Sequence, residues 1–422
     1  MCPISFESEG SSKVPHWCRS IEKMINDVCV IDGSIVDERL HDEAREALQR
    51  GPLAVDETTG GFVVLRYRDV EALAHNPRLA GVGLTIFDFL GVSAGPFRDW
   101  YSGLMFTNEG VAHHRLRHLV QKAFTPRSVE LLRADAIAES NRRVDELARE
   151  GGGDLIVTFG RFSTWMMCRL IGVPESDVTS FGDWLDALSP VFGLMEPEQI
   201  AAATEAIVAL AAYIDNLVGR RRAHPGDALV DALIDASVDG DRLTHDEVVG
   251  MIANLLVGGH DTTESQLACV MLQLLRHPAQ MSTVRTDPTL SPMAVSEGTR
   301  LEPSIPIIPR TVTEPFDLLD EHVAAGTWVS LSVASANRDP SVWVDADSFE
   351  VMRFAAPGSP KLLSFGAGAH YCLGASLARL TMDEAIASLV KGPALEASVD
   401  PFAIPWKRVL GRSPEQLAVA VV

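Results

Sequence analysis

The sequence predicts a mainly α-helical fold with small β-sheets, in the α+β class and built as one large unit. Amphipathic helical patterns run through most of its 422 residues, whereas strand-like segments are short and lie near the two ends. No internal repeat, low-complexity stretch or interdomain linker interrupts the chain. We therefore expect a single domain over residues 1–422, with a short N-terminal tail, residues 1–14, outside the folded part.

The composition argues against several classes of partner. A formal net charge of −21 argues against nucleic acid, because phosphate binding needs a basic surface. No run of about 18 uncharged apolar residues predicts a membrane span, and the opening MCPISFESEG lacks the order of a secretion signal. Six scattered cysteines indicate free thiols rather than a disulfide framework. We expect a cytoplasmic, monomeric enzyme without a membrane anchor.

Local patterns place several elements toward the ends and in the middle of the chain. FVVLR (62–66) is typical of a strand, and the helix that follows it ends at Asn76-Pro77. An amphipathic run over 198–222 ends in three arginines, which suit the partial negative charge of a helix C-terminus. TWVSLSV (327–333) predicts another strand after an Ala-Gly turn.

The longest predicted helix has an unusual centre. Thr244 and Glu247 form a capping box, and the apolar pattern then continues to Arg276, about 32 residues or roughly 48 Å. Its middle is apolar nearly all round, which indicates a helix that crosses the protein interior. The sequence GGHDTT (258–263) breaks this pattern, because two glycines cost roughly 2 kcal/mol relative to alanine and the polar groups need partners. Such a break indicates either a functional groove or a helix bend with satisfied polar groups.

A glycine-rich loop around one cysteine is the most specific signal. In SFGAGAHYCLGASLARL (364–380), three glycines bracket Cys372 and a helix-forming run follows. Glycines allow a tight loop and the close approach of a flat ligand. A cysteine just before a helix meets backbone N–H groups and the positive end of the dipole, which lower its pKa and favour the metal-binding thiolate. For a lone cysteine, a buried structural role would be the more common interpretation.

This segment resembles the cysteine-loop signature of the cytochrome P450 family, F-x-x-G-x-H-x-C-x-G followed by L-A-R. The matching residues are Phe365, Gly368, His370, Cys372, Gly374, Leu377, Ala378 and Arg379. Further family motifs follow the expected order, so the resemblance covers nearly the whole chain. It implies the P450 fold, with the long helix lying over a haem b group and Cys372 as its iron ligand.

One of these motifs is implied to bind oxygen, and another is implied to support the fold. GGHDTT resembles the family's oxygen-binding motif in the long helix. Glu297 and Arg300 form an E-x-x-R motif on a short helix that begins at Ser291-Pro292, and Arg353 matches the arginine that joins them. We expect these three residues to support the cysteine loop rather than to take part in chemistry.

The resemblance also implies a set of haem-binding residues. His113 and Arg117 lie at i and i+4 of a helix over 111–124, so both side chains can meet one anionic group. For any one of these residues a surface ion pair is the alternative interpretation, but as an ordered set they favour propionate binding. The expected haem contacts are His113, Arg117, Gly258, Arg310, Phe365, Gly366, His370, Cys372 and Gly374.

The implied activity is a monooxygenase reaction, the hydroxylation or epoxidation of a hydrophobic small molecule. Thr262 would hydrogen-bond the bound oxygen and Asp261 would carry protons to it. Two alternatives remain: a peroxide-using relative, for which this pair would be unnecessary, and a non-catalytic haem protein that senses or sequesters a ligand.

The substrate and the redox partners are inferred in the same way. Electrons would come from NAD(P)H through ferredoxin and ferredoxin reductase, and Arg115, His118 and Lys122 form a second face of the 111–124 helix where an acidic ferredoxin could dock. The alternative for each is an ordinary solvated polar face. Apolar residues over 79–106 and near 305 predict a terpenoid, steroid, fatty acid or polyketide substrate. The expected substrate contacts are Phe87, Phe89, Trp100, Val257, Ile305, Ile307 and Ile308.

Overall fold

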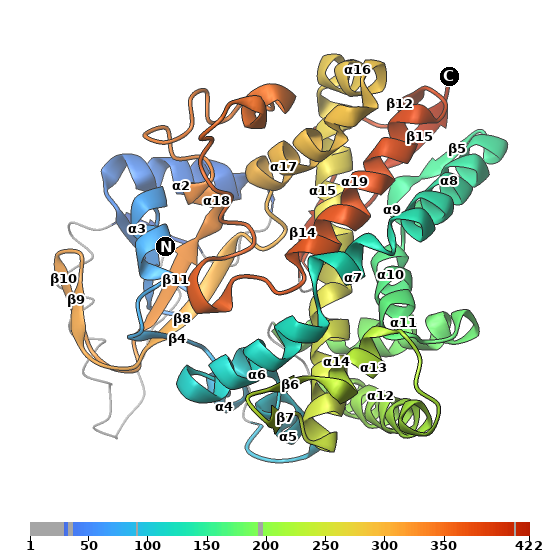
Figure 1. Cartoon of the computed structure of the whole chain (residues 1–422). Helices are drawn as coiled ribbons and strands as arrows, with labels where there is room; N and C mark the ends of the chain where they lie inside the picture. The colour runs from blue at the N-terminus through green and yellow to red at the C-terminus, as the bar shows by residue number, and fades with distance from the viewer. Residues whose placement is uncertain (1–28, 33–36, 90–91, 193–196, 409–410) are drawn as a thin grey trace.

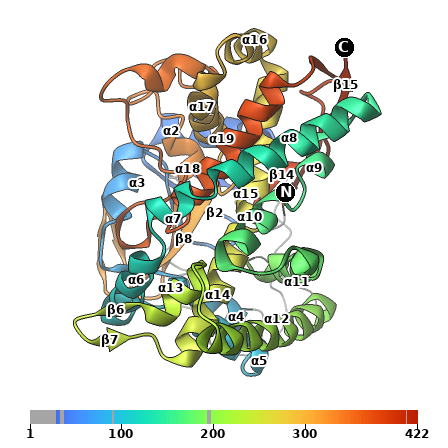
Figure 2. The same cartoon turned by 45° about the vertical axis from the view of Figure 1, so that its right-hand side comes forward.

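The computed structural model describes residues 29–32, 37–89, 92–192, 197–408 and 411–422. A sheet-containing region lies on one side and a larger helical region on the other, and both views agree on this division (Figures 1 and 2). The predicted tail over residues 1–14 lies outside the described residues. The expectation of a mainly helical protein with small sheets is confirmed.

The largest sheet has six strands in the order β1-β2-β3-β11-β8-β4. Strand β11 pairs in parallel with β3 and antiparallel with β8, which brings Val329 opposite Arg310. The strands predicted at 62–66 and 327–333 are β3 and β11. The bounds in this sheet are β1 Cys29–Ile31, β2 Leu53–Asp56, β3 Phe62–Val64, β4 Leu79–Gly81, β8 Ile307–Val312 and β11 Trp328–Ser332.

Smaller sheets lie around the helices. One has three strands in the order β12-β15-β5, and three more are two-stranded. Their bounds are β5 Gly152–Asp154, β12 Leu395–Ala397 and β15 Ala418–Val421; β6 Ser237–Val238 and β7 Asp241–Arg242; β9 Phe316–Leu318 and β10 Glu321–Val323; β13 Trp406–Arg408 and β14 Arg412–Pro414.

The helices include the predicted ones at 111–124, 198–222 and 291 onward. Their bounds are α2 Arg39–Arg50, α3 Tyr67–Leu73, α4 Thr85–Phe89, α5 Pro96–Ser102, α6 Gly110–Ala123, α7 Pro126–Glu130, α8 Arg133–Glu150, α9 Leu155–Thr158, α10 Phe162–Ile171, α11 Val178–Leu188, α12 Pro197–Ala223, α13 Leu229–Asp235, α14 His245–Gly259, α15 Asp261–Arg276, α16 Pro278–Thr286, α17 Ser291–Leu301, α18 Val333–Ala336 and α19 Ala375–Lys391.

The long central helix is present but interrupted, which corrects the expectation of one continuous helix. Thr244 and Glu247 form the predicted capping box at its start, with Glu247 N to Thr244 Oγ1 at 3.2 Å. The helix divides at His260, whose ψ of −86° departs from the helical value. Two preceding glycines weaken the helix at this point, and Thr262 Oγ1 donates to Gly258 O at 2.7 Å across the break.

A buried ion-pair network fixes the end of α17. Arg300 donates to both carboxylate oxygens of Glu297 at 2.8 and 2.9 Å, and Arg353 donates to the same acid at 2.9 Å. Arg300 also donates to the carbonyls of Asn337 and Ala346, each at 2.7 Å. Because two fully buried charges need such partners, the network ties α17 to the segment that leads toward the cysteine loop.

Helix α12 is long and largely apolar. Among the described residues, its Glu198–Ala223 part has the length and composition of a membrane-crossing helix. One helix of this kind is weak evidence, because the core helices of soluble proteins pass the same test. Here α12 packs against α11 and α14.

Candidate functional site

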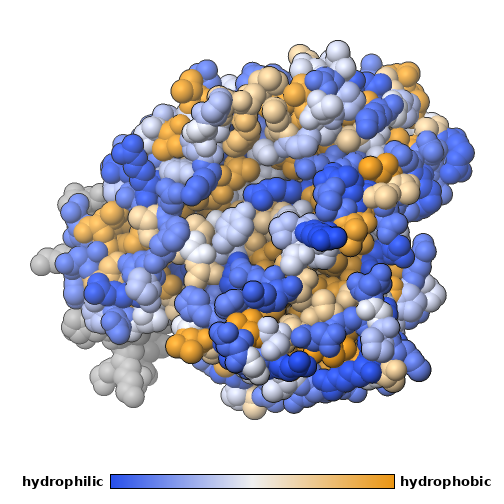
Figure 3. Space-filling view, in the orientation of Figure 1, coloured by the Kyte–Doolittle hydropathy of each residue, from blue (hydrophilic) through white to orange (hydrophobic). Residues whose placement is uncertain are grey.

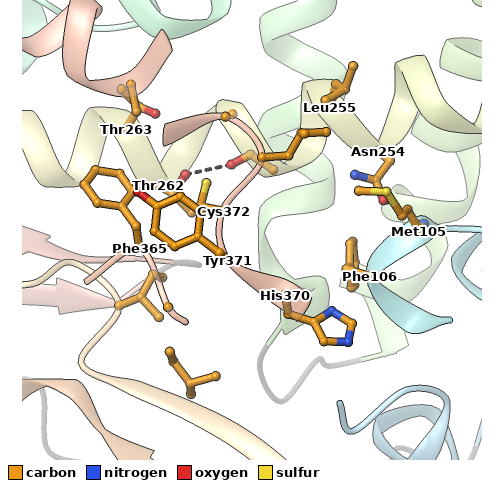
Figure 4. A pocket seen from close by; sticks show the side chains of 18 of the residues that line it. Met105, Phe106, Asn254, Leu255, Thr262, Thr263, Phe365, His370, Tyr371 and Cys372 are labelled. Atoms are coloured by element: carbon orange, nitrogen blue, oxygen red, sulfur yellow. Dashed lines mark hydrogen bonds between the residues drawn. The ribbon is translucent and has the colours of Figure 1, made fainter. Parts of the chain in front are cut away.

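The site is a cavity of about 430 Å³ between the central helix and the cysteine loop (residues 364–374). The polar surface of one face of the molecule gives way to apolar residues around a recess near its middle (Figure 3). Close up, Cys372, Thr262 and Phe365 lie on one side, and Met105, Phe106 and Asn254 lie on the other (Figure 4).

Backbone geometry positions Cys372 at the cavity. Gly366 and Gly368 have φ angles of 72° and 69°, a region that side chains disfavour. A Cβ at Gly368 would lie only 2.4 Å from the carbonyl oxygen of Ala74, so a larger residue would push the loop away from α3. The N–H of Cys372 donates to Phe365 O at 2.8 Å, which closes the loop just before α19. The cysteine side chain is exposed toward the cavity that it lines.

The thiol of Cys372 experiences opposing effects. Burial within the protein raises its pKa. The N–H groups of Gly374 and Ala375 and the charges of Arg117 and Arg379 lower it, as the position before a helix predicts. Burial outweighs these contributions, so the net pKa of the thiol is above its ordinary value. The expected stabilising groups are in place, but a bound cation would be needed to complete the thiolate's stabilisation.

Two stacked histidines lie at one end of the cavity. The rings of His113 and His370 are 4.2 Å apart, and both residues line the cavity. Burial, His370 and Arg117 lower the pKa of His113 to about 4. His113 is buried, and its Nε2 has no hydrogen-bond partner among the residues that the structure describes. A buried polar atom without a partner is costly, so this position suits the carboxylate of a ligand.

Two arginines border the same end. Arg117 donates from Nη2 to Tyr371 O at 2.5 Å, which links α6 to the cysteine loop. Arg310, on β8, donates to Pro309 O at 3.0 Å and lines the cavity. Burial lowers the pKa of Arg310, and the nearby carboxylate of Glu109 raises it. The four predicted propionate-binding side chains therefore come together from three parts of the chain.

Glu109 is a member of this group that the sequence did not reveal. It accepts from His370 Nε2 at 3.0 Å and from Gly81 N at 2.6 Å. Burial alone would raise its pKa, but the contacts with His370 and Gly81 hold it below the ordinary value. Its position just before α6 was visible in the sequence, but nothing there indicated its partner 261 residues away.

The predicted proton-transfer pair divides between two environments. Thr262 lines the cavity, with its hydroxyl donating to Gly258 O. Asp261 is not among the lining residues, and its Oδ2 accepts from Gly411 N at 2.8 Å. The hydroxyl of Thr262 therefore faces the cavity, whereas the carboxylate of Asp261 binds Gly411, directly before β14.

The predicted substrate contacts also divide. Ile305 and Ile308 line the cavity. Phe87, Trp100, Val257 and Ile307 are not among its lining residues; Phe87 is fully buried against Phe97 and Tyr101. The side chain of Phe89 lies outside the described residues. Lining residues that the sequence analysis did not select include Tyr101, Met105, Phe106, Asn254, Leu255, Ser163, Met167, Gln266 and Ser304.

Comparisons with known proteins identify the family. The cytochrome P450 family model matches residues 176–288 and 288–401, which together cover more than half of the chain. This chain belongs to the cytochrome P450 family. Luteothin monooxygenase of Streptomyces thioluteus is 31% identical over 379 residues, 87% of this chain and 89% of that protein. Cytochrome P450 monooxygenase PikC of Streptomyces venezuelae is 36% identical over 308 residues, 72% of each chain.

A solved structure supports the same conclusion. A mutant of the mixed-function P450 MycG, in complex with mycinamicin V, superposes with a TM-score of 0.77 at 28% identity. The match covers 93% of this chain and 100% of that one. The protein is therefore a P450 monooxygenase of the bacterial type, whose family uses haem b, a small-molecule substrate and redox partner proteins.

The cavity fits haem b on the evidence of this chain's own residues. It offers the thiol of Cys372, and glycines rather than larger side chains line it at positions 366 and 374. It also offers the guanidinium of Arg310 and a buried nitrogen on His113 that has no partner in the described part of the chain, and both suit carboxylates. In a P450, the iron of haem b needs a thiolate ligand and its propionates need hydrogen-bonding or charged partners.

Proposed function

We propose that this P450 inserts one oxygen atom from O2 into a C–H or C=C bond of an apolar small molecule, using electrons from NAD(P)H through ferredoxin and ferredoxin reductase. The observation that supports this most is that the thiol of Cys372 and the hydroxyl of Thr262 line one cavity. The bound haem supplies the oxygen chemistry, and the thiolate increases the electron density at its iron.

The protein's own residues would hold the haem and manage protons beside it. Cys372 would hold the iron, and His113, Arg117, Arg310 and His370 would hold the propionates. Phe365, Gly366, Gly374 and Gly258 would leave room for the flat ring. Thr262 donates its single hydroxyl proton to Gly258 O, so its Oγ1 would accept a hydrogen bond in the cavity and hold a proton donor there. Asp261 would supply protons from the side of Gly411.

The lining of the cavity favours a large apolar substrate. Tyr101, Met105, Phe106 and Leu255 contribute aromatic and aliphatic surface, and Ile305 joins them from the segment before β8. Apolar walls with few polar groups are typical of sites for lipophilic ligands. One relative is named for luteothin and another was solved with mycinamicin V, so we propose a bacterial secondary metabolite of the polyketide class.

Isotope labelling tests the proposed reaction. Purified holoprotein would be supplied with NADH, ferredoxin, ferredoxin reductase and ¹⁸O2, together with compounds selected by their effect on the haem absorption spectrum. One ¹⁸O atom should appear in the product. Product formation with peroxide but not with NADH would favour the peroxygenase, and binding without product from either oxidant would favour a sensor.

A further inference from the structure

A buried histidine at the break in the central helix joins three helices. His260 is only 3% exposed. Its Nδ1 lies 2.5 Å from the hydroxyl of Thr164 on α10, and its Nε2 lies 2.9 Å from the carboxylate of Asp186 on α11. Because both ring nitrogens are used, the imidazole is fixed in position and orientation.

The backbone of His260 is held by the same neighbours. Its carbonyl accepts from Ser163 Oγ on α10 at 2.8 Å, while the helical hydrogen bond from Glu264 N is long, at 3.5 Å. Ser163 Oγ also lies 2.9 Å from Glu264 Oε1 and lines the cavity. Helix α10 therefore supplies a hydrogen bond at the point where the central helix is interrupted.

Charged groups around the ring strengthen its link to α11. Burial opposes protonation of His260, but Asp186, Glu264 and Asp261 outweigh it and raise its pKa above 6.5. The bond to His260 lowers the pKa of Asp186 in turn. A charge-assisted bond is shorter and stronger than a neutral one.

Asp186 is fixed from a second direction. Its Oδ2 accepts from Arg161 at 2.7 Å, and the same arginine binds Asp183, one turn earlier on α11, at 2.7 Å. The side chain of Asp186 is 54% exposed, so this network runs from the surface to the buried break. A displacement of α11 would therefore act directly on His260.

We propose that His260 is a positioning residue that fastens α11 to the break in the central helix and thereby sets the geometry of Asp261 and Thr262. The two residues follow it in sequence, and the Thr262 hydroxyl spans the break to Gly258. The effect on turnover rests on the proposed function. The attachment of α11 does not.

Hydrogen exchange in the holoprotein tests the attachment. His260→Leu removes both ring contacts, and Asp186→Asn weakens one at a half-exposed position. Both variants should speed amide exchange by about tenfold at 183–189 and 261–264. His245→Leu is the matched control, because His245 on α14 pairs with Asp215 on α12 at 2.5 Å, far from the break. It should leave those segments unchanged.

The outcomes separate the possible roles. Local acceleration in both variants, with product formed per NADH falling in His260→Leu and not in His245→Leu, supports the proposal. Unchanged exchange in Asp186→Asn overturns it, even if His260→Leu does not fold. Acceleration spread evenly over the chain also overturns it, since that indicates a general loss of stability. Exchange needs no turnover, so failure of the proposed reaction would leave this result intact.

Discussion

At the scale of single residues, Cys372 faces the cavity because its own amide is bound to Phe365 and two glycines shape the loop. If its thiolate holds the iron, Cys372→Ser should abolish the thiolate-type carbon monoxide spectrum of the reduced protein. Cys29→Ser is the control, since Cys29 lies on β1 in the sheet region, and it should keep the full spectrum. A normal spectrum in Cys372→Ser would refute the assignment.

The pair at the central helix should give two different defects. Thr262→Ala removes the cavity-facing hydroxyl, so NADH consumption should continue while electrons are lost to peroxide and product falls. Asp261→Asn keeps the shape but removes the acid, so turnover should slow by roughly 10²–10⁴, as for a lost general acid. Product, peroxide and NADH are measured together, with Thr262→Ser as the variant that should recover coupling. Full, coupled turnover in Thr262→Ala and Asp261→Asn would remove them from the mechanism.

How far the sequence could specify the site depends on how local each signal is. Cys372 with its glycines and the His113/Arg117 pair are local patterns, and the structure brings them to one cavity. The bond of Glu109 to His370 and that of His260 to Asp186 join segments far apart in the chain. Such pairings are formed only when distant segments pack together, and no local pattern in a single sequence indicates which distant residues will meet.

At the scale of elements, a second buried charge cluster joins the ends of the fold. Glu302, just after α17, binds His41 on α2 at 2.8 Å, Arg338 at 3.2 Å and also Arg412 on β14. All but Arg338 are almost fully buried. Burial alone would raise the pKa of Glu302, but these contacts hold it well below 4.5.

This depressed pKa predicts a stability that depends on pH. The folded protein keeps Glu302 charged below the pKa of 4.5 of the unfolded chain, so its stabilisation is complete above that pH and is lost as pH falls through the folded value. Glu302→Gln should lower the free energy of unfolding by about 3–5 kcal/mol at pH 7. The difference should shrink in acid.

Denaturation of the holoprotein at several pH values measures this difference. Glu146→Gln is the control, because Glu146 is half-exposed and pairs with Arg142 on the surface of α8. It should change stability by less than about 1 kcal/mol at any pH. A gap between wild type and Glu302→Gln that stays constant into strong acid would contradict the predicted role of the charge.

Whether a segment forms a helix or a strand was predictable where its pattern was long. Whether a helix continues without a break was not predictable. The capping box at Thr244 correctly marked the start of the central helix, and the runs at 198–222 and 327–333 became α12 and β11. The sequence predicted one helix with an unusual centre, but it did not predict that the helix divides in two at His260. The hydrogen-bond partners of His260, Ser163 and Thr164, lie on another helix. Local propensity predicts where a helix is weak, but it does not predict which neighbouring residues will bind the backbone there.

At the scale of the whole molecule, the net charge of −21 would repel an acidic ferredoxin, so the proposed docking requires a local basic surface. The basic residues of helix α6 form part of such a surface. Arg115, one of the three predicted docking residues, is instead bound to Asp241 and Glu247 at 2.7 and 2.6 Å. His118 and Lys122 are exposed on the same helix and are the better candidates.

Charge reversal at matched positions separates a docking surface from net charge. Lys122→Glu and Lys391→Glu change the total charge equally, but Lys391 lies at the far end of α19, away from α6 in both views (Figures 1 and 2). If ferredoxin docks at α6, Lys122→Glu should raise the KM for ferredoxin several-fold at low ionic strength, while Lys391→Glu changes it little.

Salt dependence and the binding spectra of the two lysine variants test the docking surface further. The effect of Lys122→Glu should diminish as salt is added, because exposed charges are screened over a Debye length of about 8 Å at physiological ionic strength. Carbon monoxide and substrate-binding spectra should stay the same in both variants, since neither lysine lines the cavity. Equal effects of the two reversals would mean that ferredoxin responds to the overall charge of the molecule, and the α6 surface would then have no special part in electron delivery.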